Sequence, residues 1–150
     1  MSLYSTVEAE LTYENQEDFN TAIDTLLKGG WINKENIFID ETLDLITEKS
    51  TIDRNDKRIH IPYFHYRNLT YILKGLVKDT KGWAIWTSTD GCFEGGVIRD
   101  GVETHYDLNE WAKTNADEDA PDIEKEPENY CIWADDIEQL FNETFTDELA

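Results

Sequence analysis

The sequence lacks the features that mark membrane, secreted and zinc-binding proteins. No apolar run approaches the roughly 18 residues that a membrane span needs, and residues 1–12 lack the basic start and apolar centre of a secretory signal. The 150 residues include two cysteines, Cys92 and Cys131, and no Cys-x-x-Cys spacing. We therefore predict a cytoplasmic protein with free thiols, no metal site and no contact with a membrane.

Basic residues are scarce, and they are scarcest in the last third of the chain. The formal net charge is −20, from 13 Lys and Arg against 33 Asp and Glu. Residues 1–100 carry 17 acids and 11 bases (net −6), whereas residues 101–150 carry 16 acids and two bases (net −14). Within the first part, the segment 54–81 is locally basic. The molecule is expected to be electrically polarised, and its overall charge opposes direct binding of nucleic acid.

The acidity does not come from the absence of a hydrophobic core. Hydrophobic residues make up 39% of the chain, and they include five Trp, seven Tyr and six Phe. Disordered acidic chains are poor in aromatic residues, so this composition predicts a globular domain. A length of 150 residues suits one such domain.

Hydrophobic periodicity predicts alternating strands and helices. Two helices are expected, one that begins after the N-cap Asn15 and ends at Gly29-Gly30, and one that carries an apolar stripe from Tyr66 to Val77. The strand before the second helix should end near Pro62, because proline cannot donate a hydrogen bond within a sheet. Alternation of apolar and polar residues predicts strands over 3–13, 37–46, 58–63, 83–89, 93–99 and 102–108.

This order of elements predicts an α+β fold. The order β-α-β-β-α-β is that of a ferredoxin-like plait, a mainly antiparallel sheet with two helices on one face, here extended by a β-hairpin. A short helix is expected over 108–114, because Asp107 and Glu110 have the spacing of a capping box. We predict an α+β core domain (1–114), an acidic linker (115–129) and a C-terminal acidic amphipathic helix (130–150) that packs on the core.

Motifs for catalysis and for cofactors are missing. Ser88, Asp90 and Cys92 lie near a strand end, but no Gly-x-Ser-x-Gly elbow surrounds the serine. His60 and His105 occupy strand positions that are predicted to face outward, and no His-x-x-x-His pair occurs. The acidic linker resembles the start of an EF-hand loop but lacks its glycine and its bidentate glutamate. We predict no cofactor and a binding protein rather than an enzyme.

The density of charge resembles that of DNA. Duplex DNA carries one negative charge per about 1.7 Å, so 20 charges correspond to roughly 34 Å of duplex. A globule of this length has a diameter of about 38 Å, from the scaling of the radius of gyration. A surface with acids spaced like phosphates could therefore occupy the groove of a nucleic-acid-binding protein.

The last third of the chain resembles, in composition, the nucleic-acid-mimicking anti-restriction and anti-CRISPR proteins of phages and mobile elements. The resemblance covers mainly residues 103–150 and contains no diagnostic motif. It implies a protein partner, a basic nucleic-acid-binding protein or complex that the chain blocks sterically, and leaves the oligomeric state open. The predicted partner-binding residues are the acids of the linker and of the last helix: Asp117, Glu118, Asp119, Asp122, Glu124, Asp135, Asp136, Glu138, Glu143, Asp147 and Glu148.

Two other functions are compatible with the sequence. The chain could be an acidic adaptor that uses the apolar face from Trp133 to Phe145 for docking. It could also be a small enzyme or ligand-binding plait with a site near Ser88, Asp90 and Cys92. The locally basic segment could alternatively receive the acidic tail of the same chain.

Overall fold

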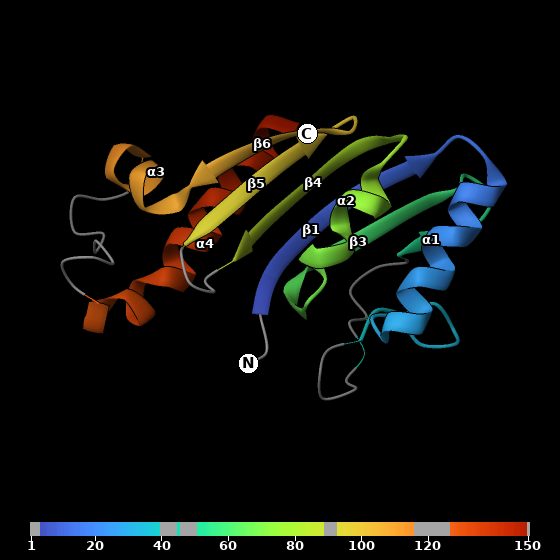
Figure 1. The fold of residues 1–150 in the computed structure, drawn as a ribbon, viewed down its shortest axis with the longest axis horizontal. Helices are drawn as coiled ribbons and strands as arrows, with labels where there is room; N and C mark the ends of the chain where they lie inside the picture. Colours follow the sequence, from blue (N-terminus) through green and yellow to red (C-terminus); the bar gives the residue numbers. More distant parts are fainter. Residues whose placement is uncertain (1–3, 40–44, 46–50, 89–92, 116–126, 150) are drawn as a thin grey trace.

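The protein is a six-stranded antiparallel sheet with helices on both faces. The computed structural model describes residues 4–39, 45, 51–88, 93–115 and 127–149, and for residues 4, 5 and 127–135 it describes the backbone alone (Figure 1). The strands are β1 (Tyr4–Tyr13), β2 (Ile52–Asp53), β3 (Arg58–Arg67), β4 (Thr80–Ser88), β5 (Glu94–Arg99) and β6 (Val102–Asp107). The helices are α1 (Gln16–Gly29), α2 (Thr70–Val77), α3 (Leu108–Asn115) and α4 (Pro127–Leu149).

The predicted plait is confirmed. The strands lie in the order β2-β3-β1-β4-β5-β6, and every pair is antiparallel. The first four strands with α1 and α2 form the split β-α-β plait, and the β5-β6 hairpin extends it beyond β4. No helix among the described residues is long and apolar enough to cross a membrane.

Two hydrophobic clusters lie on opposite faces of the sheet. The first joins α1 and α2 to odd-numbered positions of β1, such as Val7 and Leu11. The second joins α3 and α4 to β4 and β5 through residues such as Ile85 and Phe141. Since side chains alternate along a strand, one face of β1 carries the first cluster and the other carries Thr6 and Glu8. Figure 1 shows α1 and α2 in front of the sheet and α4 behind it.

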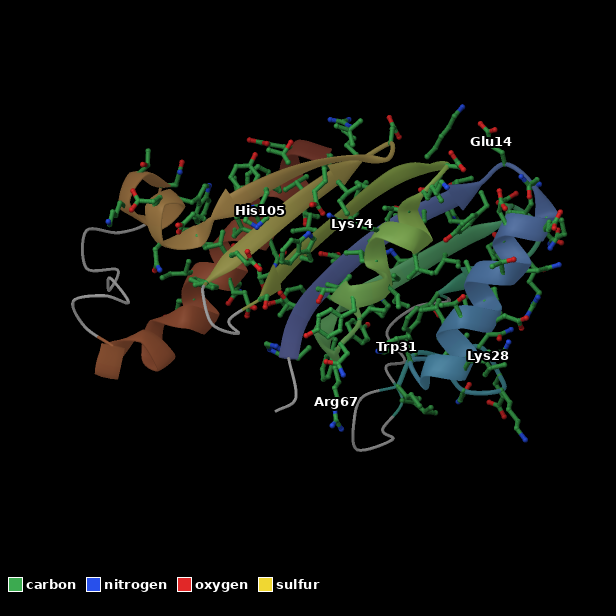
Figure 2. The ribbon with its side chains drawn as sticks, in the orientation of Figure 1. Glu14, Lys28, Trp31, Arg67, Lys74 and His105 are labelled. Atoms are coloured by element: carbon green, nitrogen blue, oxygen red, sulfur yellow. The ribbon has the colours of Figure 1, made fainter. Side chains whose placement is uncertain are left out.

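The ends of α1 follow the predicted capping chemistry. Asn15 Oδ1 accepts a hydrogen bond from the backbone N–H of Asp18 at 2.8 Å. Gly30 closes the helix in the left-handed conformation, at φ 82°. Beyond it, Trp31 covers Gly29 and donates from Nε1 to the carbonyl of Arg67 at 2.8 Å, which ties the helix end to β3 (Figure 2).

Two predicted elements were placed wrongly. The strand that precedes β3 and pairs with it is Ile52–Asp53 rather than 37–46, because Asp53 Oδ1 accepts from the N–H groups of Asn55 and Asp56 and closes a tight turn into β3. Of the predicted strand, Phe38 and Ile39 make isolated bridges to Ile32 and Leu45, while 40–44 and 46 lie outside the described residues. Tyr66 belongs to β3 and not to the second helix, which begins at Thr70.

The prediction that the strand ends near Pro62 was also wrong. β3 continues to Arg67, and its register with β1 shifts between the pairs Val7–Phe64 and Ala9–Ile61. Two residues of β3, Pro62 and Tyr63, therefore lie opposite one residue of β1, which defines a β-bulge. A bulge accommodates proline inside a sheet because the extra residue leaves the ladder of hydrogen bonds.

Helix α4 packs on the sheet through a stripe of aromatic and aliphatic residues. Phe141 is fully buried, and its ring centroid lies 4.7 Å from that of Phe145, 5.4 Å from Trp111 and 5.5 Å from Tyr106. The helix begins at Pro127, inside the predicted linker, and proline is favoured in the first turn of a helix. The rest of that linker, 116–126, lies outside the described residues.

The central position of Phe141 predicts a large loss of stability on truncation. Phe141→Ala should lower the free energy of unfolding by about 3–5 kcal/mol, because it removes a fully buried ring and leaves a cavity. Leu140→Ala, at the neighbouring and 36% exposed position, should cost less than about 1 kcal/mol. Urea denaturation followed by circular dichroism measures both values, and equal losses would contradict this packing of α4.

Candidate functional site

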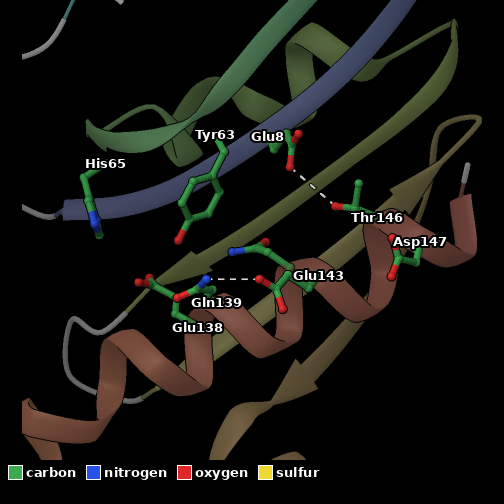
Figure 3. Close-up of a pocket in the computed structure, with 9 residues that line it drawn as sticks. Glu8, Tyr63, His65, Glu138, Gln139, Glu143, Thr146 and Asp147 are labelled. Carbon is green, nitrogen blue, oxygen red and sulfur yellow. Dashed lines mark hydrogen bonds between the residues drawn. The ribbon is translucent and has the colours of Figure 1, made fainter. Parts of the chain in front are cut away.

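A groove runs between α4 and the strands β1 and β3. Helix α4 contacts β4 and buries its apolar stripe beside it, and its polar side meets β1 through hydrogen bonds to Thr6 and Glu8. The resulting cavity, about 510 Å³, is called the α4 groove (Figure 3). Its described lining consists of Glu8, Tyr63, His65, Glu138, Gln139, Asn142, Glu143, Thr146 and Asp147.

The bulge in β3 places an aromatic ring in this groove. Tyr63 occupies the bulge opposite Glu8, and Figure 3 shows its side chain directed from the sheet toward α4. Bulges re-aim side chains, and they are frequent next to functional sites. The hydroxyl of Tyr66 donates to the carbonyl of Pro62 at 2.6 Å, which satisfies a backbone acceptor at the bulge.

The floor of the groove is a buried polar cluster. Glu138 is 4% exposed, and its Oε1 accepts hydrogen bonds from the hydroxyl groups of Thr6, at 3.2 Å, and Thr87. Thr6 and Thr87, both fully buried, also lie within hydrogen-bonding distance of each other, so their two hydroxyl protons are shared among three contacts. A buried carboxyl group requires such donors, since burial without hydrogen bonds is costly.

Asn142 completes the floor, one helical turn after Glu138. It is 4% exposed, and its Nδ2 donates to Thr6 Oγ1 at 3.4 Å. No donor among the described residues hydrogen-bonds to Asn142 Oδ1. An unsatisfied buried acceptor costs about 1–3 kcal/mol, so this oxygen lowers the free energy of unfolding.

The rim of the groove is acidic. Glu143 and Asp147 are exposed on α4, and Glu8 faces them from β1 (Figure 3). Thr146 donates to Glu8 at 3.4 Å, and Gln139 donates to Glu143 at 3.0 Å, which connect rim residues to one another. The described lining includes four carboxyl groups and no Lys or Arg, so the groove attracts cations.

The structure distributes the predicted partner-binding residues unevenly. Asp136, Glu143, Asp147 and Glu148 are exposed on α4, and two of them, Glu143 and Asp147, line the groove. Glu138 is buried, so its expected place on the exposed surface was wrong: its neighbours Thr6 and Thr87 hold it inside. The side chain of Asp135 lies outside the described residues, as do Asp117, Glu118, Asp119, Asp122 and Glu124.

Sequence reasoning missed the residues that the sheet contributes to the groove. Thr6, Glu8 and Tyr63 come from strands that are distant from α4 in sequence, and their meeting depends on the strand order. One signal was present: Glu138 and Asn142 stand four residues apart, so they share a face of the helix. That face borders the apolar stripe, which marks it as partly buried.

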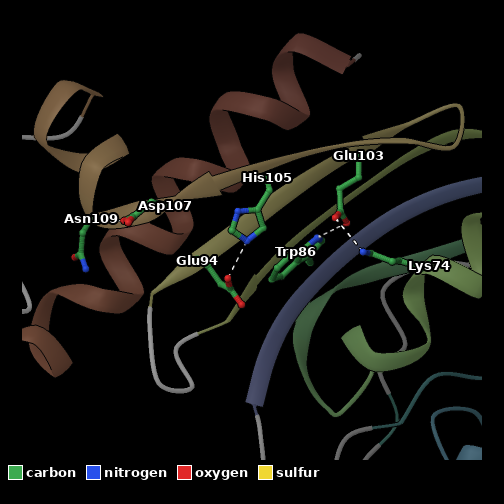
Figure 4. A network of polar contacts seen from close by, with 7 residues as sticks. All are labelled: Lys74, Trp86, Glu94, Glu103, His105, Asp107 and Asn109. Carbon is green, nitrogen blue, oxygen red and sulfur yellow. Dashed lines mark hydrogen bonds and ion pairs between the residues drawn. The ribbon is translucent and has the colours of Figure 1, made fainter.

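A second polar cluster lies on the opposite face of the sheet. Trp86 lies over Gly96 and donates from Nε1 to Glu103 at 3.3 Å, and Lys74 pairs with Glu103 at 3.6 Å (Figure 4). His105 bonds to Glu94 at 2.8 Å. These groups are paired with one another, and Ser88 nearby is 4% exposed. The other predicted members of a catalytic site, Asp90 and Cys92, lie outside the described residues.

The locally basic segment supplies partners for acids of the sheet. Arg58 pairs with Glu10 at 3.6 Å and with Asp53 at 3.8 Å, as Lys74 does with Glu103. Helix α2, which carries Lys74, packs on the face opposite α4, so the acids of α4 whose side chains are described do not dock on Lys74. Among the described residues no cluster of His, Cys, Asp and Glu could hold a metal ion.

Comparisons with protein-family models, with curated proteins and with solved structures found no match.

The buried tyrosine at the bulge predicts a loss of stability in alkali. Burial, and to a smaller extent the charge of Glu8, raise the pKa of Tyr66 well above its ordinary value. Its unfolded form ionises near pH 10, so the free energy of unfolding should fall as the pH rises above about 10. Tyr66→Phe should cost about 1–2 kcal/mol at neutral pH, since the Pro62 carbonyl loses its donor, and should reduce the alkaline loss.

Denaturant midpoints at neutral and alkaline pH measure both effects. Tyr71→Phe serves as the control, because Tyr71 is 71% exposed and should change neither value. An alkaline loss of the same size in the Tyr66→Phe variant as in the unchanged protein would contradict the assignment.

Proposed function

We propose that the chain is a non-catalytic inhibitor that mimics nucleic acid and blocks a basic nucleic-acid-binding protein. The partner is a host defence protein of the restriction or CRISPR type, and α4 presents the acids that it binds. The observation that supports the proposal is the acidic stripe of α4 beside a groove whose described lining contains no Lys or Arg.

The stripe follows from helical spacing. Asp136, Glu143 and Asp147 stand seven and four residues apart, so they share one side of α4, and all three are exposed. The whole helix contains seven acids and no Lys or Arg. A rigid helix holds such charges at fixed spacing, which is what a substitute for a phosphate backbone needs.

Long-range electrostatics supports the same function. A net charge of −20 attracts basic proteins, and such steering raises association rates by roughly tenfold to a thousandfold at low salt. The same charge repels DNA and RNA, so the partner is a protein that binds nucleic acid and not nucleic acid itself.

The described part of the apolar face that an adaptor would use is packed against the sheet. Ile137 and Phe141 are buried in the cluster between α4 and the sheet, and Phe145 packs against them. A partner could use this face only if α4 left the sheet. The exposed side of α4, which is acidic, remains available.

Charge-neutral variants test the function. Expression of the chain in bacteria with restriction or CRISPR systems should raise the plating efficiency of a targeted phage in at least one strain. The α4 variant Asp136→Asn/Glu143→Gln/Asp147→Asn should lose at least about tenfold of this effect, since these carboxyl groups steer and orient a basic partner. The matched control Glu14→Gln/Glu17→Gln/Asp24→Asn changes the net charge equally at exposed positions around α1 and should retain the effect.

A biochemical assay gives the second readout. Nucleic-acid-binding proteins captured from extracts of the protected strain should be released by salt and by duplex DNA. If both variants lose phage protection equally, protection depends on net charge alone and not on the acids of α4. The absence of protection in every strain would contradict the proposed function.

A further inference from the structure

Strand β6 forms one edge of the sheet, and its outer side has no partner strand among the described residues. The strand pairs with β5 without a bulge, and Figure 1 shows it along one margin of the ribbon. In the part of the chain that the structure describes, no backbone hydrogen bond beyond this ladder reaches residues 102–107. Such an edge is a template on which a further strand can pair.

The opposite edge of the sheet is protected against pairing, whereas the β6 edge is not. Strand β2 has only two residues, and β3 beside it carries Pro62 within a bulge. Short strands, proline and bulges are common means of keeping an edge from pairing. The six residues of β6 include none of these devices, and Val102 at its start is 70% exposed.

The charged side chains of β6 already have partners on the same chain. Glu103 pairs with Lys74 at 3.6 Å and accepts from Trp86 Nε1 at 3.3 Å, and His105 bonds to Glu94 at 2.8 Å (Figure 4). The pair with Lys74 reduces the charge at the edge, although the chain carries −20 overall. At physiological ionic strength, exposed charges more than about 8 Å apart are largely screened from each other.

The hairpin turn determines which backbone groups of β6 point outward. The two-residue turn Asp100-Gly101 has positive φ at both residues, 50° and 85°, so Arg99 and Val102 form the first hydrogen-bonded pair of the ladder. Hydrogen-bonded pairs alternate along an antiparallel ladder, so even-numbered residues of β6 bond to β5. The N–H of Leu108, which donates to the carbonyl of Phe93 at 3.0 Å, follows the same alternation. The backbone groups that point outward belong to Glu103, His105 and Asp107.

Two self-pairings of β6 join five residues of each copy, 102–106 or 103–107. Both place outward residues opposite outward residues, as a two-fold axis in an antiparallel ladder requires. Pairing of 103–107 puts Glu103 of one copy opposite Asp107 of the other, and like charges directly opposite each other destabilise a sheet. Pairing of 102–106 puts Glu103 opposite His105 instead. The charges therefore select the second pairing.

The selected pairing is also self-complementary on the other face of the sheet. Thr104 lies on the two-fold axis, opposite Thr104 of the second copy, and Val102 lies opposite Tyr106. Threonine pairs and pairs of an aromatic with a β-branched residue are favourable across strands. The exposed Val102 side chain would thus be covered by an aromatic ring.

We propose that two copies of the chain pair antiparallel through β6, with the two-fold axis at Thr104. Glu103 of each copy exchanges two N–H···O=C bonds with His105 of the other, so four backbone bonds join the copies. The two sheets become one continuous antiparallel sheet. The α4 groove lies at β1 and β3 and takes no part in this contact, so the dimer does not depend on the proposed function.

Cysteine cross-linking tests the pairing and its register. In a Cys92→Ser/Cys131→Ser background, Thr104→Cys should form a disulfide-linked dimer under mild oxidation, because non-hydrogen-bonded pairs bring Cα atoms to about 4.5 Å. His105→Cys is the matched control, since residue 105 faces itself only in the rejected register. Non-reducing electrophoresis should show at least about tenfold less dimer for the control, because Cα atoms more than about 7 Å apart cannot be bridged.

Self-association without a cross-link gives the second readout. Sedimentation at physiological salt should show a mass that rises with concentration from 17.5 kDa toward twice that value. His105→Pro removes an outward N–H that the β5 ladder does not use, so the fold is kept. It deletes two of the four bonds between the copies and should weaken the dimer at least about tenfold. His105→Ala loses the same side chain but keeps the N–H, and should weaken the dimer less.

Three results would overturn the proposal. They are a mass that stays at 17.5 kDa up to the solubility limit, a dimer that His105→Pro leaves unchanged, and equal cross-linking of the two cysteine variants. If His105→Pro does not fold, the comparison of Thr104→Cys with His105→Cys decides alone.

Discussion

The apolar contact between α4 and the β4-β5 part of the sheet determines where the polar groups of the site lie. Ile137 and Phe141 bury one side of the helix, and the next positions around it, Glu138 and Asn142, then meet the sheet at its boundary with β1. Because β1 turns Thr6 and Glu8 toward this face, the edge of the contact is polar. The acids farther around the helix remain exposed. The packing of α4 therefore places some of its polar residues at the buried floor of the groove and its exposed acids at the rim.

Several features that lower the stability of the fold lie at this boundary. Glu138 is a carboxyl group held inside by two hydroxyl groups, Asn142 Oδ1 has no donor among the described residues, and Pro62 interrupts the ladder of β3. Each of them lowers stability in isolation. Features of this kind concentrate where a protein binds something, because a site has to keep groups available that the fold alone would satisfy. Elsewhere on the sheet, the Trp86 and His105 cluster has its polar groups paired.

The sequence predicted the plait and most of its elements, because local signals determine them. Asn15 and Gly30 bound α1, and the turn at Asp100-Gly101 joins β5 to β6. The prediction from sequence failed where tertiary pairing overrides a local rule. Pro62 is tolerated within β3 because a bulge removes it from the ladder, and the two-residue β2 is too short to produce a periodic signal.

The site was predicted only in part, for the same reason. Exposed acids of α4 could be identified from composition and spacing. Tyr63, Glu8 and Asn142 join them through strand order and helix placement, which no local pattern encodes. Glu138 illustrates the limit: by sequence it is one acid among many, and its burial depends on the hydroxyl groups of two distant strands.

If a basic partner binds in the α4 groove, a basic peptide should protect the same residues from hydrogen–deuterium exchange. Exchange of the chain is measured with and without an arginine-containing peptide, at low and at high salt. Protection at low salt should be confined to the β3 bulge around Tyr63 and to α4 from Asp136 to Asp147, and it should disappear at high salt. Protection centred on α1 and α2, or unchanged by salt, would contradict binding in the α4 groove.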